Sequence, residues 1–322
     1  MDDHRDYSDP EHRRLMIGKM EEYERKGWFN HEIEDDHEHT PLDVNKLDLY
    51  RKKFSSKCKS YFCNQFARLF INNEIRKKVM VFNPKKDIVG GDNLKGITGG
   101  MILTLNHVHP YDHYMPYLAL RRYFGYWRFR MFKLVKDSNY TYPGPVGVLM
   151  RNCNTVPISE SNAKLNSESF KVVEYLLKKG KKICVFAESS LWHHYKKPRP
   201  TKMGAFLLAA KNSVPVVPCF MTMTDAGKIG KDGLQAQHFT LHIMPPIYPD
   251  KSLSVKQNTL KMQEYNTQQW KECYERGYGI PLEYLPPLDE NVDENSETVV
   301  ETFDANIATK SSEKVETISN QD

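Results

Sequence analysis

The sequence lacks a long apolar run, paired cysteines and an apolar N-terminal segment. No stretch approaches the roughly 18–20 apolar residues that a helix needs to cross a bilayer, so we expect no transmembrane span. Residues 1–5 contain no apolar core of the kind found in a signal peptide, so we expect no secretory leader. The 6 cysteines form no Cys-x-x-Cys pair, and Cys184 and Cys219 lie in apolar runs. This pattern predicts free thiols in a reducing compartment.

Basic residues are scarce at both ends of the chain, and acidic residues are scarce in its middle. Residues 1–49 hold 15 Asp and Glu against 7 Lys and Arg, and residues 287–322 hold 10 against 2. Residues 50–286 carry 37 basic and 16 acidic residues, a net charge of +21. Such a body is attracted to a polyanion, either an anionic membrane surface or nucleic acid. A well-solvated basic surface would give the same composition.

Three regions follow from this distribution. We expect an acidic, flexible or loosely helical arm over 1–49, one domain over 50–286, and a disordered acidic tail over 287–322. Within the domain, apolar runs alternate with helical patterns, which predicts an α/β fold with a mainly parallel central sheet flanked by helices. Ser167 and Gly180 are expected to bound one helix. The predicted strands are 101–106, 129–136, 154–159, 181–187, 214–220 and 239–244, and the predicted helices are 112–123, 144–151, 167–179, 202–212 and 256–276.

An amphipathic helical segment is predicted over 54–81, before the sheet. Apolar and aromatic residues recur every four positions from Tyr61 to Phe70, and lysines and arginines surround them. A basic amphipathic helix of this kind either lies on a membrane surface or packs its aromatic stripe on the sheet. A second run of rings and cations, residues 121–132, fits a membrane surface, single-stranded nucleic acid or a buried strand.

Four segments contain residues suited to catalysis or substrate binding. His107 and Asp112 follow the apolar run 101–105, and a carboxylate that accepts from one imidazole nitrogen leaves the other free to take a proton. Residues 186–190 (Phe-Ala-Glu-Ser-Ser) follow another predicted strand. Residues 202–210 begin a helix with Lys-Met-Gly, and residues 214–218 (Val-Pro-Val-Val-Pro) form a strand with few free backbone donors.

In this order and spacing, the four segments resemble the blocks of the glycerolipid acyltransferases, the 1-acylglycerol-3-phosphate acyltransferases and their relatives. The Asn-His-x-x-x-x-Asp block matches residues 106–112, and the Phe-Pro-Glu-Gly-Thr-Arg block matches 186–191. A Lys-x-Gly helix matches residues 202–204, and a Val-Pro-Val-x-Pro block matches 214–218. The resemblance covers about residues 95–245.

The resemblance implies a fatty acyl transfer from acyl-CoA or acyl carrier protein to a lipid hydroxyl, such as that of 1-acylglycerol-3-phosphate. His107 would be the general base and Asp112 its orienting partner, with no covalent acyl-enzyme and no cofactor beyond the acyl donor. We expect a peripheral protein on the cytoplasmic, inner face of an anionic membrane, with no nucleic-acid partner. The resemblance and the residues nearby predict a substrate-binding set of Glu188, Ser189, Ser190, Lys202 and Gly204, with no metal ligand.

Two arginines of the family's blocks are missing. The second block usually supplies an arginine for the acceptor phosphate, but residues 154–161 contain none and Glu160 lies near its place. Leu191 stands where the third block has its arginine. Losing both removes bidentate phosphate contacts, which favours an acceptor without a glycerol phosphate unless other cations compensate. The nearby candidates are Arg151, Lys196, Lys197, Arg199 and Lys202.

Two other functions remain open from the sequence. A metal-dependent hydrolase could use His107, His109, Asp112 and His113, although one extra residue separates this set from the usual His-x-His-x-Asp-His spacing. A catalytically inactive lipid-binding protein is the other alternative. Two further groups of histidines, residues 31–39 and 193–194, lie in polar segments and are expected to be solvated.

Overall fold

The computed structural model describes residues 9–34, 41–71, 80–125 and 130–287. The chain divides into two compact units, Met1–Leu285 and Pro286–Asp322. The acidic tail predicted over 287–322 lies, apart from its first residue, outside the described residues. The expected boundary at residue 49 does not coincide with a boundary between units, because residues 1–285 form one of them.

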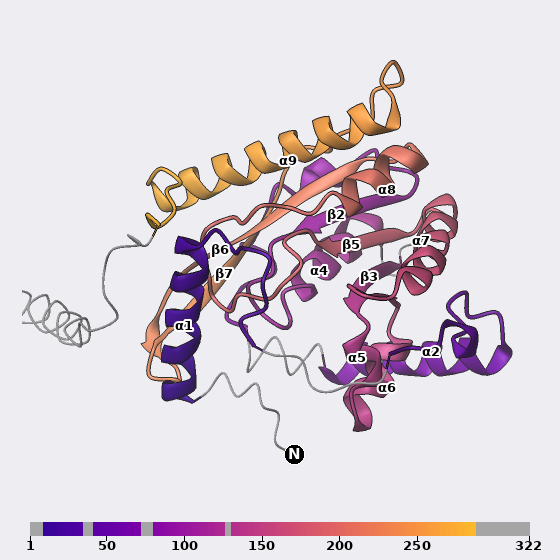
Figure 1. Cartoon of the computed structure of the whole chain (residues 1–322), viewed down its shortest axis with the longest axis horizontal. Coiled ribbons are helices and arrows are strands. Elements are labelled where there is room, and N and C mark those ends of the chain that lie inside the picture. Colours follow the sequence, from indigo (N-terminus) through magenta and orange to yellow (C-terminus); the bar gives the residue numbers. More distant parts are fainter. Residues whose placement is uncertain (1–8, 35–40, 72–79, 126–129, 288–322) are drawn as a thin grey trace, which may run out of the picture. The chain divides into compact units, whose positions relative to one another are not determined.

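The first unit is built on a seven-stranded sheet with the order β1-β7-β6-β2-β5-β3-β4 (Figure 1). All neighbouring strands of the described sheet are parallel except β6 and β7, which are antiparallel. The predicted α/β fold with a mainly parallel sheet is confirmed. The strands are β1 (Ile88–Val89), β2 (Met101–Leu105), β3 (Met131–Lys136), β4 (Thr155–Ile158), β5 (Lys182–Phe186), β6 (Val216–Ile229) and β7 (Gln235–Ile243).

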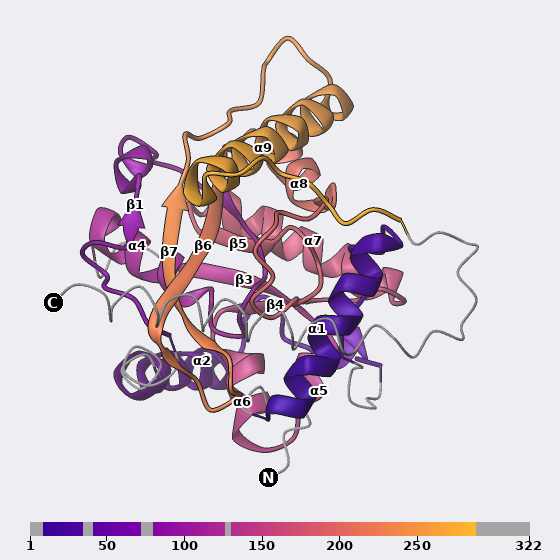
Figure 2. The same ribbon diagram turned by 90° about the vertical axis from the view of Figure 1, so that its left-hand side faces the viewer.

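Helices cover both faces of this sheet (Figure 2). Three of them, α7 (Ala163–Lys178), α8 (Gly204–Asn212) and α9 (Val255–Tyr278), pack on one face. The opposite face packs against α4 (Tyr114–Phe124). Because both faces are covered, every side chain of β2 is buried, as expected for an apolar strand in a parallel sheet. The shorter elements are η1 (Val44–Lys46), η2 (Ala67–Ile71), η4 (Gly91–Leu94), α5 (Ser138–Thr141) and α6 (Gly144–Asn152).

Several predicted boundaries were displaced, each for a local reason. α7 begins at Ala163 rather than near Ser167, because the Asn162 side chain accepts a hydrogen bond from the Leu165 amide at 2.9 Å. Gly180 follows this helix with a φ of 72°, which suits glycine. β6 extends to Ile229, well beyond the predicted run, because it pairs with β7 outside the buried core. The two-residue strand β1 was not predicted.

The N-terminal segment contains a regular helix, α1 (Pro10–Arg25), where a flexible or loosely helical arm was expected. Asp9 caps the helix, and a proline at its first position favours this start. Met16 and Met20 pack with Ile33 and Trp192 in a small buried cluster. The segment is therefore held by apolar contacts with the loop that follows β5.

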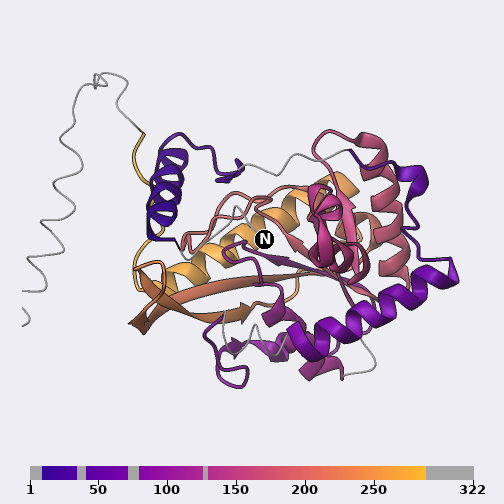
Figure 3. The ribbon, with the colours of Figure 1, turned by 90° about the horizontal axis from the view of Figure 1, so that it is seen from below.

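The amphipathic segment before the sheet forms α2 (Phe54–Phe66), which lies beside α6 (Figure 3). Its rings do not pack on the sheet, because Ser60 is the only buried residue of the helix. Phe54 is 81% exposed, Tyr61 58%, Phe62 68% and Phe66 49%. Residues 72–79 of the predicted segment, and 126–129 of the second aromatic and basic run, lie outside the described residues. Within the described part of the chain, no helix is long and apolar enough to cross a membrane.

Candidate active site

The end of β2 is held in place by Asn106, the residue before the predicted base. Asn106 is completely buried, and its side-chain amide donates to the Met221 carbonyl at 3.1 Å. Its side-chain oxygen accepts from the Met221 amide at 2.8 Å. The two bonds tie the end of β2 to β6 in the way a backbone pair would, so the next residue, His107, leaves the sheet in a defined direction.

His107 and Asp112 form the predicted pair. The Nδ1 atom of His107 lies 2.9 Å from Oδ2 of Asp112. Asp112 is fully buried, and the same oxygen accepts from the Val108 amide at 3.1 Å. Because this carboxylate accepts, the ring proton belongs on Nδ1 and the lone pair of Nε2 is free. The His107 ring also stacks on Phe186 at 3.9 Å between centroids, which fixes its plane.

A buried ion pair within the loop after β5 is hydrogen-bonded to the start of the loop after β2. Glu188 Oε2 accepts from the His107 amide at 3.1 Å and from the Arg199 guanidinium at 2.8 Å. Arg199 also donates to the Ser190 hydroxyl at 2.7 Å and to the Phe29 carbonyl at 3.0 Å. Glu188 is 1% exposed. Both carboxylate oxygens of Glu188 therefore accept from other protein groups, and Glu188 positions His107 through its backbone amide.

The rest of the predicted substrate-binding set lies near these loops in different environments. Ser189 is exposed and has a φ of 76°, a left-handed conformation that explains why the corresponding position in the family's block is glycine. Ser190 is 1% exposed. The Lys202 amide donates to the Ala187 carbonyl at 2.7 Å, which brings the start of α8 to the loop after β5. Lys202 and Gly204 are exposed there and make no hydrogen bond to His107 or Asp112 within the described residues.

Part of the chain is also similar to known proteins. Residues 85–222 match the family model described as acyltransferase. These residues belong to the acyltransferase family. The resemblance inferred from the sequence is therefore confirmed.

Two proteins similar to this chain show the extent of the match. The 1-acyl-sn-glycerol-3-phosphate acyltransferase BAT2, chloroplastic, of Brassica napus is 29% identical over 175 residues, covering 52% of this chain and 46% of that protein. The chain thus matches less than half the length of this relative. The crystal structure of the 1-acyl-sn-glycerophosphate acyltransferase PlsC from Thermotoga maritima is 18% identical, with a TM-score of 0.47, and the match covers 73% of this chain and 87% of that chain.

Two arginines are missing from the family's blocks, and five cations were candidates to replace them. Most of these cations already bond to other protein groups. Arg199 is used by Glu188 and Ser190. Lys197 pairs with Glu24, and Arg151 donates to the Tyr140 carbonyl. These three are therefore not available to a phosphate without breaking existing bonds, whereas Lys202 is exposed. Glu160, in the second block, is also exposed.

The structure divides the histidines that the hydrolase alternative would use together. His107 pairs with Asp112, whereas His109 lies beside His193 and His194. The expectation that the last two are solvated was wrong, because His193 is 4% exposed and burial lowers the pKa of both rings well below the ordinary value. Burial also lowers the pKa of His109, to about 3. Of the other group, His37 and His39 lie outside the described residues.

A cavity of about 780 Å³ extends between α2, α4 and β3. His113, which the hydrolase alternative would use, and Lys133, which was not predicted as a site residue, both line it. Burial lowers the pKa of the Lys133 ammonium, and the negative charge of Asp112 opposes this effect. No Asp or Glu of the described residues lines the cavity. Its cationic residues are Arg51, Lys57, Arg68, Arg130, Lys133, Lys179 and Lys181.

Replacing Arg199 should destabilise the fold strongly. In Arg199→Leu, Glu188 keeps its buried position without the counter-charge. Removing one partner of a buried ion pair costs about 3–5 kcal/mol, so urea unfolding should show a loss of that size. The exposed pair of Lys261 with Asp250 gives the control, since Lys261→Ala should change stability little. Equal losses in the two variants would contradict the positioning role of Arg199.

Proposed function

We propose that the chain transfers a fatty acyl group from acyl-CoA or acyl carrier protein to the hydroxyl of a lipid acceptor such as 1-acylglycerol-3-phosphate. The observation that carries the proposal is the bond between His107 Nδ1 and Asp112 Oδ2 at 2.9 Å, beside a free Nε2. Membership of residues 85–222 in the acyltransferase family supports the reaction class. The name of the relative from Brassica napus supports the acceptor.

In the proposed reaction His107 acts as a general base. Its Nε2 takes the proton of the acceptor hydroxyl as the oxygen attacks the thioester carbonyl. The tetrahedral intermediate collapses, the carbon–sulfur bond breaks, and the departing thiolate receives that proton from His107. Asp112 keeps the ring proton on Nδ1 and stabilises the imidazolium that forms between the two transfers. Every proton is returned, and no metal or acyl-enzyme takes part.

Replacing the base should abolish turnover with little effect on folding. In His107→Gln, we expect kcat to fall by about 10²–10⁴-fold, because general-base catalysis contributes that much, while KM changes little. Product formation from acyl-CoA and 1-acylglycerol-3-phosphate measures this. The matched control is His238→Gln, since His238 pairs with Asp87 and not with His107 or Asp112. Undiminished turnover in His107→Gln would contradict the mechanism, and absence of turnover in the parent chain would favour a lipid-binding protein.

The cavity favours a donor that carries phosphates, which suits acyl-CoA. Seven cations and no acid among the described lining residues give a strongly positive site. Lys133 lies at the level of Cys184 in the middle of the sheet, and Arg130 and Lys181 lie at the opposite strand ends from His107. The phosphate of a lysophospholipid is only a few bonds from its hydroxyl. The long pantetheine arm of CoA, in contrast, can span from His107 to these cations.

Removing one cavity charge should weaken the donor selectively. We expect Lys181→Met to raise KM for acyl-CoA by roughly 10–100-fold, the equivalent of one charge-assisted hydrogen bond, because Lys181 lines the cavity at the strand end opposite His107. The same acyl group on pantetheine, which lacks the nucleotide phosphates, should be used equally well by parent and variant. Lys178→Met is the control, because Lys178 is exposed on α7 and does not line the cavity. Equal effects on both donors would contradict the assignment.

The proposal places the reaction at an anionic membrane surface, on the cytoplasmic side. Phe54, Tyr61, Phe62 and Phe66 are exposed on α2, and lysines flank them in the sequence. Exposed rings beside cations suit the interface of an anionic bilayer, because the rings bury apolar area there and the cations are attracted to the anionic lipids. The free thiols of the chain suit a reducing compartment.

Removing two of these rings should weaken vesicle binding. In a Phe54→Ser, Phe62→Ser double variant, we expect affinity for vesicles containing phosphatidylserine to fall by tenfold or more, because each buried Phe contributes roughly 1.5–3 kcal/mol. Co-sedimentation measures the affinity. Leu15→Ser on α1 is the control, since Leu15 is 69% exposed but lies outside α2. Equal binding by parent and double variant would exclude α2 as the membrane contact, whatever the catalytic result.

A further inference from the structure

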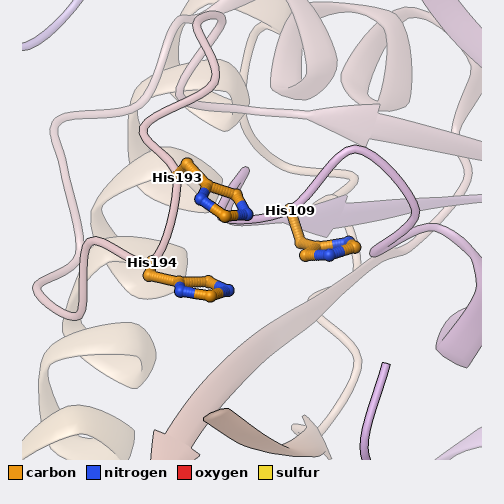
Figure 4. Close-up of side chains that lie close together, drawn as sticks. All are labelled: His109, His193 and His194. Atoms are coloured by element: carbon orange, nitrogen blue, oxygen red, sulfur yellow. The ribbon is translucent and has the colours of Figure 1, made fainter. Parts of the chain in front are cut away.

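Three histidines form a cluster that the proposed acyl transfer does not use. His109 belongs to the loop after β2, and His193 and His194 belong to the loop after β5 (Figure 4). One ring nitrogen of each lies within 4.8 Å of those of the other two. Figure 4 shows the three rings close together, with His193 and His194 one above the other and His109 beside them. We propose that these three imidazoles form a binding site for a divalent transition-metal cation of the zinc class.

The chemistry of the donors suits such a cation. Imidazole is a preferred ligand of zinc, copper and nickel, and three imidazoles leave one position for water. His109 and His193 are 6% and 4% exposed, and His194 is half-buried, so the rings are held away from bulk water. Phe239 covers one side, with centroids 5.4 Å from His109 and 5.7 Å from His194. Burial keeps the imidazoles neutral, which is the form that binds a metal.

The backbone brings the two loops together before any ion binds. The Trp192 amide donates to the His107 carbonyl at 3.1 Å, and the His194 amide donates to the Val108 carbonyl at 2.9 Å. His194 has a φ of 63°, a left-handed conformation that a non-glycine residue adopts only when its surroundings require it.

Binding requires a rotation of the rings of His193 and His194, which stack with centroids 3.9 Å apart, together with a contraction and one exchange of bonds. Ligand nitrogens around a tetrahedral zinc with bonds of about 2.0–2.1 Å lie roughly 3.3 Å apart, so the rings must close from their present separation. The half-buried ring of His194 has the most room to move. Nδ1 of His109 accepts from the Tyr111 amide at 3.1 Å, which places its proton on Nε2. Coordination through Nε2 moves this proton to Nδ1 and breaks that bond.

The charges around the cluster permit a cation. Arg13 of α1 is close enough to lower the pKa of His193 and His194 further, and Lys196 lowers that of His194 in the same way. Its Nε lies 3.6 Å from a carboxylate oxygen of Asp232, which offsets the guanidinium charge. His107 keeps its own carboxylate partner, Asp112, so the metal ligands and the proposed base are separate groups. A bound ion would therefore clamp the two loops without replacing the base.

Metal titration of the untagged full chain tests the site. Cobalt(II) should bind at one equivalent and give the intense visible absorption of a tetrahedral ion, and zinc should displace it and raise the unfolding temperature. His193→Gln and His194→Gln should each weaken zinc binding by more than the roughly 10–100-fold seen when an outer partner of a ligand is lost. His238→Gln, outside the cluster, should bind zinc as the parent does.

Zinc K-edge absorption of the loaded parent chain gives a second measurement that needs no variant. Three imidazole scatterers would support the site. The proposal would be overturned by a count of fewer than three imidazole scatterers or by a zinc affinity below that of adventitious sites on surface histidines. It would also be overturned if both Gln variants bound zinc as tightly as the parent chain. Circular dichroism of the metal-free variants shows whether each is folded. None of these measurements reads acyl transfer, so their outcome is independent of the proposed function.

Discussion

The ion pair of Glu188 with Arg199 is the constraint on which the arrangement of the active site depends. A buried carboxylate is tolerated only with a counter-charge and filled hydrogen bonds. Glu188 therefore holds Arg199 by its guanidinium and its amide, and also receives the amide of His107. Arg199 extends the connection to Phe29 in the N-terminal segment. Three segments distant in sequence must meet at this pair for either charge to be buried, and the proposed base is positioned as a result.

The two ends of the parallel strands have different electrostatic character. At the end of β2, Asp112 supplies one buried negative charge that organises His107. Toward the opposite strand ends, the cavity is lined by cations and by no acid of the described residues. This separation lets a single extended donor place its thioester at the base and its phosphates among the cations. The helix α2, whose rings are exposed, forms one wall of that cavity.

The histidines illustrate how partners assign roles to chemically identical side chains. His107 has a carboxylate at one ring nitrogen, which favours proton uptake at the other. His109, two residues later, has no carboxylate partner among the described residues and is buried against two more imidazoles and Phe239. Desolvation there opposes protonation, and the neutral ring is the form that can bind a metal. Opposite chemistry thus arises on neighbouring positions of one loop.

The sequence by itself determined the core strands, most helices and the pairing of His107 with Asp112. Those features are local: buried strands need apolar runs, and a turn of a few residues brings a carboxylate back to the preceding imidazole. Even α1 had a local signal, Asp9 before Pro10, which its charged composition masked. Only the tertiary structure decided that Arg199 belongs to Glu188, that α2 exposes its rings, and that His109 meets His193 and His194. Such contacts depend on which faces and loops pack together, and residue spacing along the chain carries no information about that.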